Sequence, residues 1–211
     1  MGPELREVFA PEPYLAITWQ VNNFCNFSCS YCNPGNWAGD NPNNGNLDLY
    51  IKNLEEIVRR YKKAGYKNFK FFFSGGEPTV WRNFIPICEW IYKTMPYATL
   101  AVNTNLSRPL KWWQKHAYLF DDIVASLHIE QVSKERYEEN SIWLCENVNY
   151  LSTKVLLHEE RFWECVEFAE HLKTVMPNYF IEWTPLYDEL SHVTGPWKYK
   201  DPKHVKFIED H

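Results

Sequence analysis

Residues 14–32 read YLAITWQVNNFCNFSCSYC and place two signals next to each other. The apolar run Tyr14–Val21 is short and rich in β-branched and aromatic residues, which predicts a buried strand. Three cysteines, Cys25, Cys29 and Cys32, follow it directly. A tight group of cysteines, rather than cysteines distributed over a small secreted chain, indicates metal or redox chemistry.

Strand and helix signals alternate along the rest of the chain. Residues 33–46 are rich in Asn and Gly and predict a loop. Leu47–Ala64 carries apolar residues at helical spacing and is followed by Gly65, a typical helix C-cap. Further strands are predicted over Phe69–Phe73, Ala98–Val102, Ile123–His128, Lys154–Leu157 and Tyr179–Thr184, and further helices over Trp81–Met95, Leu110–His116, Lys134–Leu151 and Glu159–Thr174.

This alternation predicts an α/β fold with parallel strands. Six strands separated by helices form βαβ units, and right-handed crossovers curl such units into a partial (β/α)6 TIM-like barrel. A length of 211 residues suits one domain. We expect an N-terminal extension over 1–13, the core over 14–187, and a polar C-terminal tail over 188–211 that ends in a short helix.

Composition excludes several classes of function. The chain has 22 Lys and Arg against 27 Asp and Glu, a net charge of −5, so no basic footprint for nucleic acid is evident. Neither a signal peptide nor an apolar run of membrane-spanning length stands out, which predicts a cytoplasmic protein with no membrane partner. The scattered cysteines Cys88, Cys145 and Cys165 are interpreted as small apolar residues of helices.

Three neighbouring thiols suit an iron–sulfur cluster better than other metals. A [4Fe–4S] cluster takes four ligands, so three cysteines leave one iron open to a small molecule. A zinc site that borrows a histidine is an alternative, although zinc prefers two separated pairs of ligands. Three cysteines that meet by chance form a weaker alternative, because exposed thiols are reactive.

The spacing C-x-x-x-C-x-x-C, with Tyr31 before the last cysteine and a strand before the motif, resembles the Radical SAM superfamily. The resemblance implies that Cys25, Cys29 and Cys32 bind a [4Fe–4S] cluster and that S-adenosylmethionine (SAM) chelates the fourth iron. It also places Tyr31 in the cofactor site. Reductive cleavage of SAM would release a 5′-deoxyadenosyl radical that abstracts hydrogen from a substrate. An electron donor of the flavodoxin or ferredoxin type is implied.

A second motif, SGGEP over Ser74–Pro78, ends the second predicted strand. By itself it predicts a tight turn. In the superfamily that the cysteines resemble, a GGEP turn contacts the methionine part of SAM, which assigns Gly75, Gly76, Glu77 and Pro78 to cofactor binding. Glycines let the backbone approach a ligand closely. A backbone carbonyl and Glu77 are expected to accept from the SAM ammonium group.

Polar residues also occur at the ends of later strands, where α/β barrels gather their sites. Asn103, Ser126 and His128 are candidate SAM ligands. The resemblance implies a ribose contact near the end of the fourth strand, for which Ser126 is preferred to His128. Five further residues could line an adenine or substrate pocket, although helix capping and core packing explain them equally well: His158, Glu159, Trp183, Thr184 and Tyr187.

The leading hypothesis is therefore a radical SAM enzyme that acts on a small metabolite or a peptide. Activation of a glycyl-radical enzyme is an alternative. A non-catalytic zinc or iron–sulfur binding module is a second alternative, and it leaves the GGEP turn unexplained. The sequence shows no cysteine-rich extension of the SPASM type. Either one cluster suffices or the chain is a shortened form of a longer protein.

Overall fold

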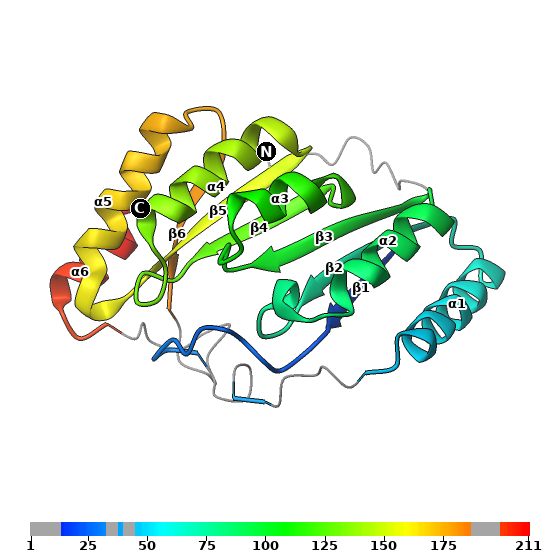
Figure 1. Ribbon diagram of the computed structural model, residues 1–211. Coiled ribbons are helices and arrows are strands. Elements are labelled where there is room, and N and C mark those ends of the chain that lie inside the picture. Colours follow the sequence, from blue (N-terminus) through cyan, green and yellow to red (C-terminus); the bar gives the residue numbers. More distant parts are fainter. Residues whose placement is uncertain (1–13, 33–37, 40–44, 187–198) are drawn as a thin grey trace, which may run out of the picture.

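A computed structural model describes residues 14–32, 38–39, 45–186 and 199–211 (Figure 1). The predicted N-terminal extension, most of the 33–46 loop, Tyr187 and most of the predicted tail lie outside the described residues. The strands form one parallel sheet in the order β1-β2-β3-β4-β5-β6. Their bounds are β1 Tyr14–Gln20, β2 Asn68–Ser74, β3 Ala98–Thr104, β4 Asp122–Leu127, β5 Tyr150–Leu157 and β6 Phe180–Pro185. The predicted α/β partial barrel with parallel strands is confirmed.

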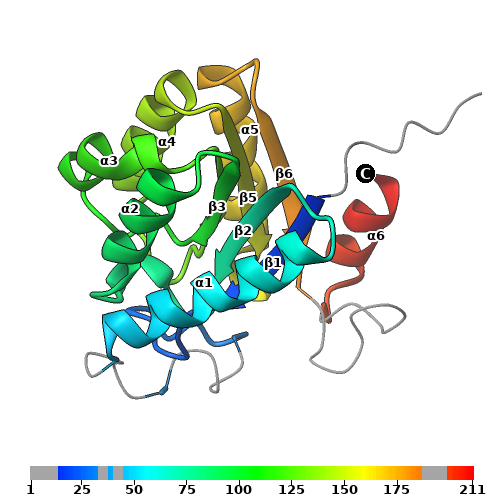
Figure 2. The same ribbon diagram turned by 90° about the vertical axis from the view of Figure 1, so that its right-hand side faces the viewer.

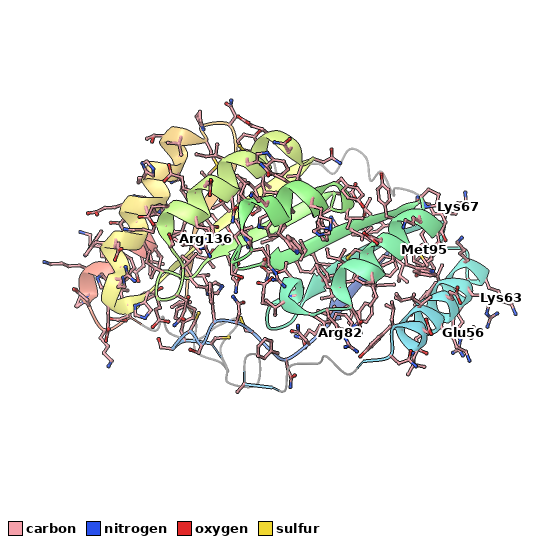
Figure 3. All side chains as sticks on the ribbon, in the orientation of Figure 1. Glu56, Lys63, Lys67, Arg82, Met95 and Arg136 are labelled. Carbon is pink, nitrogen blue, oxygen red and sulfur yellow. The ribbon has the colours of Figure 1, made fainter. Side chains whose placement is uncertain are left out.

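Helices follow the strands and cover one face of the curved sheet (Figure 2). Side chains fill the space between the two layers, including the buried Met95 (Figure 3). The α-helices are α1 Leu47–Lys63, α2 Phe84–Thr94, α3 Leu110–His116, α4 Lys134–Asn147, α5 Phe162–Val175 and α6 Pro202–Asp210. Short 3₁₀ helices occupy Pro78–Val80, Ala117–Leu119 and Glu159–Arg161.

Strand β2 shows how the sequence separates the two faces of the sheet. Phe69, Phe71 and Phe73 are buried against the helices, since alternate residues of a strand point to the same face. Lys70 and Phe72 point to the inner face and stay half-buried. The inner face of the barrel therefore remains open enough to accept a ligand.

The two faces of β2 predict different costs for two adjacent substitutions. Phe71→Ala is expected to lower the free energy of unfolding by about 3–5 kcal/mol, because a fully buried aromatic ring leaves a cavity. Phe72→Ala is expected to lower the free energy of unfolding by about 1 kcal/mol, close to the average effect of a substitution. Urea denaturation of both variants measures the difference. Equal costs would show that the inner face is packed as tightly as the outer one.

Several element boundaries differ from the predicted ones. Helix α4 ends at Asn147, not Leu151, because Val148 adopts an extended backbone and Tyr150 already pairs with Asp122 of β4. The 3₁₀ turn at Pro78–Val80 delays the start of α2 from Trp81 to Phe84. A similar 3₁₀ turn delays the start of α5 from Glu159 to Phe162.

The short C-terminal helix α6 packs against α5 and β6. Its N-cap Asp201 accepts a hydrogen bond from the Lys203 backbone N–H at 2.8 Å. The Phe207 ring lies 5.3 Å from that of Trp183 and 5.6 Å from that of Phe162, measured between centroids. Among the described helices, none combines the length and the apolar composition that a membrane span requires.

Candidate functional site

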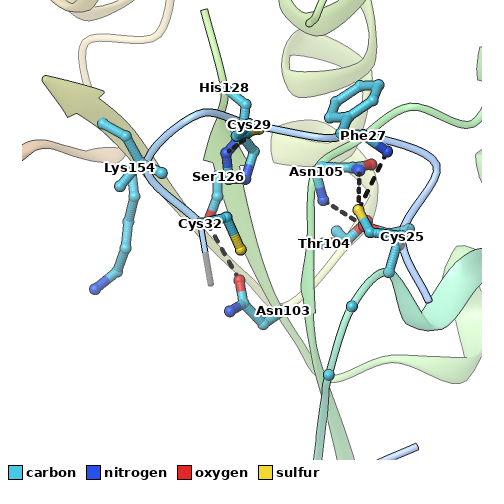
Figure 4. Close-up of a pocket in the computed structure, with 14 residues that line it drawn as sticks. Cys25, Phe27, Cys29, Cys32, Asn103, Thr104, Asn105, Ser126, His128 and Lys154 are labelled. Carbon is cyan, nitrogen blue, oxygen red and sulfur yellow. Dashed lines mark hydrogen bonds between the residues drawn. The ribbon is translucent and has the colours of Figure 1, made fainter. Parts of the chain in front are cut away.

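A cavity of about 320 Å³ opens where the sheet presents the carboxyl ends of its strands (Figure 4). This volume falls in the range of small-molecule pockets, about 300–1,000 Å³. It brings together the three cysteines, the glycine turn and the polar ends of β3 and β4. The lining residues are Cys25, Phe27, Cys29, Cys32, Gly75, Gly76, Glu77, Asn103, Thr104, Asn105, Ser126, His128, Lys154 and Leu156.

The glycine turn after β2 holds the start of the cysteine loop. The Gly76 N–H donates to the Asn22 carbonyl at 3.1 Å, and the Asn22 side-chain amide donates to the Glu77 carbonyl at 3.1 Å. Gly75 has a φ of +134°, and a Cβ there would lie 2.5 Å from the Asn22 carbonyl oxygen. Only glycine fits this position, because the two backbones touch.

The three cysteine thiols line the same cavity. The Phe27 N–H donates to Cys25 Sγ at 3.3 Å, and Cys29 Sγ lies 3.4 Å from His128 Nδ1. Burial raises the pKa of Cys25 to about 11 and that of Cys29 to about 12. Without a metal, the thiols of Cys25 and Cys29 are therefore protonated at neutral pH, and a metal must displace their protons to bind.

The three thiols of the cavity are donors that a metal group could use. Within the described part of the chain, no three His, Cys, Asp or Glu side chains gather closely enough to hold one metal ion. A [4Fe–4S] cluster has no such requirement, because each thiolate binds a different iron. Three thiols spread around one cavity fit that donor pattern, and the remaining space borders the glycine turn.

Glu77 is fully buried and links the ends of β2 and β3. Its Oε1 accepts from the Thr79 N–H at 3.0 Å and from the Thr104 hydroxyl at 2.9 Å, and its Oε2 accepts from the Asn105 N–H at 2.7 Å. Burial raises the pKa of the Glu77 carboxyl, and these hydrogen bonds oppose the rise. The carboxyl thus has protein donors of its own, and its expected contact with the SAM ammonium group stays a prediction.

Asn103, Ser126 and His128 all line the cavity, as their positions at the strand ends predict. The Ser126 hydroxyl donates to Asn103 Oδ1 at 3.2 Å (Figure 4). Burial lowers the pKa of His128 to about 4, so the ring is neutral at pH 7. Its Nδ1 lies 2.9 Å from the Tyr31 hydroxyl. The hydrogen bond between Ser126 and Asn103 places the polar groups of these two residues side by side in the cavity.

Tyr31 and Pro78 occupy different surroundings. Tyr31 stacks on His128 with ring centroids 6.0 Å apart, and it lines a second cavity of about 140 Å³. Pro78 is buried at the first position of a 3₁₀ helix, where its missing N–H has no cost. Neither residue is part of the described lining of the main cavity. A direct contact of either with SAM stays a prediction.

The remaining candidates for an adenine or substrate pocket that the structure describes lie in different places. His158 and Glu159 line the second cavity rather than the main one. Trp183 packs under α6 on the outer face, which favours its interpretation as a core residue. Thr184 lies near Glu182, with its hydroxyl 3.5 Å from Glu182 Oε1.

Sequence reasoning missed Phe27, Lys154 and Leu156 of the main cavity, and it marked the polar end of the third strand, residues 103–105, without the contact that Asn105 makes. Lys154 lines it and forms an ion pair with Glu182, with Nζ and Oε1 2.8 Å apart. A lysine in an otherwise apolar strand was the available signal. Asn105 reaches the cysteine loop through a hydrogen bond from its side-chain amide to Asn26 Oδ1 at 3.1 Å. That contact joins residues 79 positions apart, and local patterns do not reveal it.

This fold and cavity define an α/β partial-barrel domain with three thiols and a glycine turn at the carboxyl ends of its strands. The chain matches the family model described as "Radical SAM superfamily" over residues 19–169, more than half of its length, and it belongs to that superfamily. The superfamily consists of enzymes whose cofactors are a [4Fe–4S] cluster and S-adenosylmethionine.

Curated relatives match part of the chain. It is 28% identical to the GTP 3′,8-cyclase of Actinobacillus pleuropneumoniae serotype 5b (strain L20) over 105 residues, which are 48% of this chain and 30% of that protein. It is 29% identical to the GTP 3′,8-cyclase of Pectobacterium atrosepticum over 117 residues, 54% of this chain and 34% of that protein. The matched part thus spans about a third of these relatives.

Solved structures share the fold. The structure described as native anSMEcpe with bound AdoMet gives a TM-score of 0.61 at 18% identity and covers 94% of this chain and 59% of its own. Streptococcus suis SuiB bound to S-adenosylmethionine gives 0.52 at 16% identity and covers 93% of this chain and 44% of its own. Both similarities extend over nearly all of the present chain.

Proposed function

We propose that this chain is a catalytic radical SAM domain that cleaves S-adenosylmethionine reductively and abstracts hydrogen from a small polar metabolite. The observation that carries the proposal is the convergence of three thiols and a glycine turn on one cavity. Membership of the superfamily supports it independently. A binding module without catalysis would have no use for the open space beside the glycine turn.

Different residues of the cavity would bind different parts of the cofactors. Cys25, Cys29 and Cys32 would hold the [4Fe–4S] cluster. When bound, the cluster supplies the electron that cleaves SAM to methionine and a 5′-deoxyadenosyl radical. The backbone of Gly75 and Gly76 would hold the methionine part of SAM, since glycines permit close approach. A pocket framed by buried strand ends also limits access of water to a reactive species.

Asn103 and Ser126 would hold the ribose of SAM. Their amide and hydroxyl groups lie side by side at the strand ends and present both donors and acceptors, as ribose hydroxyls require. His128 is neutral because burial lowers its pKa to about 4. A neutral imidazole adds no positive charge beside the thiolates, so His128 would act as a hydrogen-bonding partner of the loop.

The inner face of the barrel supports a small polar substrate. Lys154, which lines the cavity, forms a partly exposed ion pair there with Glu182. Charged pairs left partly exposed suit a ligand that carries polar groups better than an apolar one. The curated relatives are named for GTP, which is also a small polar molecule.

Anaerobic reconstitution tests the proposal. The purified chain is expected to take up about four irons, as a [4Fe–4S] cluster requires. Added dithionite and SAM should then yield 5′-deoxyadenosine and methionine, measured by liquid chromatography and mass spectrometry. A one-electron donor of the flavodoxin or ferredoxin type should replace dithionite. Binding of iron without any cleavage of SAM would contradict a catalytic role and favour the cluster-binding module.

The substrate class can be tested in the same assay. Deuterium-labelled nucleotides and small polar metabolites are expected to transfer deuterium into 5′-deoxyadenosine, because the radical removes hydrogen from its substrate. A labelled peptide is the comparison. Transfer from the peptide alone would contradict the metabolite assignment.

A further inference from the structure

The second half of the cysteine motif is attached to two side chains from distant parts of the barrel. Glu130 follows β4, and His158 follows β5. Glu130 Oε2 accepts from the Ser30 N–H at 2.8 Å. Glu130 Oε1 lies 3.0 Å from His158 Nε2, which is also 3.4 Å from the Ser30 hydroxyl. Ser30, Glu130 and His158 thus form a closed hydrogen-bonding network next to Cys29.

The network is largely shielded from solvent and well oriented. The Glu130 side chain is 20% exposed and that of His158 is 10% exposed. The Glu160 N–H donates to His158 Nδ1 at 3.2 Å, which leaves His158 Nε2 as the donor toward Glu130. Burial raises the pKa of Glu130, but the hydrogen bonds from Ser30 and the partnership with His158 outweigh it and lower that pKa overall. The carboxylate is thus ionised at neutral pH.

The two halves of the loop have different anchors. The first half is tied to the glycine turn, where the Glu77 N–H donates to the Phe24 carbonyl at 2.9 Å. In the second half, the Cys32 N–H donates to the Cys29 carbonyl at 3.1 Å, so both cysteines move with one turn. Ser30 lies inside that turn. An anchor on Ser30 therefore sets the position of Cys29 and Cys32 together.

We propose that Glu130 and His158 form a positioning pair that holds the turn of Cys29 and Cys32 in its cluster-binding conformation. This inference rests on the proposed function. Neither side chain belongs to the described lining of the main cavity, so the pair acts through the loop and not on the substrate. The partners behind metal ligands commonly determine how long a metal is retained.

Three variants and one control test the pair. Glu130→Ala removes the acceptor of the Ser30 N–H. Glu130→Gln keeps an oxygen acceptor for that N–H, but its amide NH2 cannot accept from His158 Nε2. His158→Phe keeps a ring beside Tyr31 and removes the hydrogen bonds. Glu138→Ala is the matched control, since Glu138 Oε2 lies 3.1 Å from His171 Nε2 in a second carboxylate–histidine pair. That control pair joins α4 to α5, away from the cysteine loop.

The main readout is the rate at which the reconstituted protein loses iron to a chelator under anaerobic conditions. Glu130→Ala and His158→Phe are expected to lose iron about tenfold faster than the wild type, the lower end of the usual effect of such partners. Glu130→Gln should lose it about threefold faster than the wild type, because it keeps the hydrogen bond from the Ser30 N–H in a neutral form, roughly half as strong as a charge-assisted one, and loses the acceptor for His158. Glu138→Ala should match the wild type.

A second readout separates positioning from general destabilisation. The change that SAM causes in the electron paramagnetic resonance spectrum of the reduced cluster should weaken in Glu130→Ala and return in Glu130→Gln. Equal rates of iron loss in the wild type, Glu130→Ala and His158→Phe would overturn the inference while leaving the proposed function intact. A wild type that binds no iron would overturn both. If Glu130→Ala fails to fold, the iron loss of the other two variants decides the question. Loss from His158→Phe and Glu130→Gln at the wild-type rate would overturn the inference, and faster loss from both would support it.

Discussion

Replacing Cys29 by alanine is expected to abolish the iron–sulfur cluster and, with it, the cleavage of SAM. Cys29 is the most buried of the three motif thiols, and it lies 3.4 Å from His128 Nδ1 at the wall of the cavity. Two remaining thiolates cannot hold a cluster that already leaves one iron to SAM. Iron content and the visible absorbance of the reconstituted protein should fall to background, and 5′-deoxyadenosine formation should fall at least about a hundredfold.

Cys88→Ala is the control for this loss. Cys88 is fully buried on the apolar face of α2, and burial raises the pKa of its thiol well above the ordinary value. It behaves as a small apolar residue, so its replacement should lower stability by about 1 kcal/mol and leave iron content unchanged. Loss of iron in Cys88→Ala, or retention of iron and activity in Cys29→Ala, would refute the assignment of the ligands.

Gly75→Ala is expected to weaken SAM binding at least tenfold, which corresponds to about 1.4 kcal/mol. The backbone at this position has a φ of +134°, a region that residues with a Cβ avoid at a cost of about 1–3 kcal/mol. The added Cβ would also lie 2.5 Å from the Asn22 carbonyl oxygen, which is backbone and cannot rotate away. The turn must shift, and the start of the cysteine loop shifts with it. Calorimetric titration of the reconstituted protein with SAM measures the effect.

Gly65→Ala separates backbone strain from the clash. Gly65 follows the C-cap residue of α1 and has a φ of +100°, yet a Cβ there would meet no heavy atom within 4 Å. This variant is expected to lose about 1–2 kcal/mol of stability through strain alone and to bind SAM as the wild type does. If Gly75→Ala also binds SAM normally, the glycine turn has no part in the cofactor site.

Much of the barrel could be predicted because its signals are local. The helical spacing of α1 and the alternation along β2 each depend on a few neighbouring residues. The predicted boundary between α4 and β5 was wrong, because the pairing of Tyr150 with Asp122 decides it. Pairing across strands depends on residues far apart in the chain, and short windows of sequence do not contain it.

The candidate site divides in the same way. The order and spacing of Cys25, Cys29 and Cys32, and the glycines after β2, are properties of the chain and are enough to indicate the superfamily. The side chains that hold the motif in place come from elsewhere. Ser30 and Glu130 are 100 positions apart, and Ser30 and His158 are 128 positions apart.

Adjacent residues specify the cysteine motif, the glycine turn and the alternation of strands and helices, so all three could be predicted from the sequence alone. The surroundings of these features depend on the folded chain. Folding turns Glu77 toward Thr104 and Asn105 and brings Glu130 and His158 behind the cysteines. This difference arises because parallel strands bring their carboxyl ends to one edge of the sheet, where residues distant in the chain become neighbours.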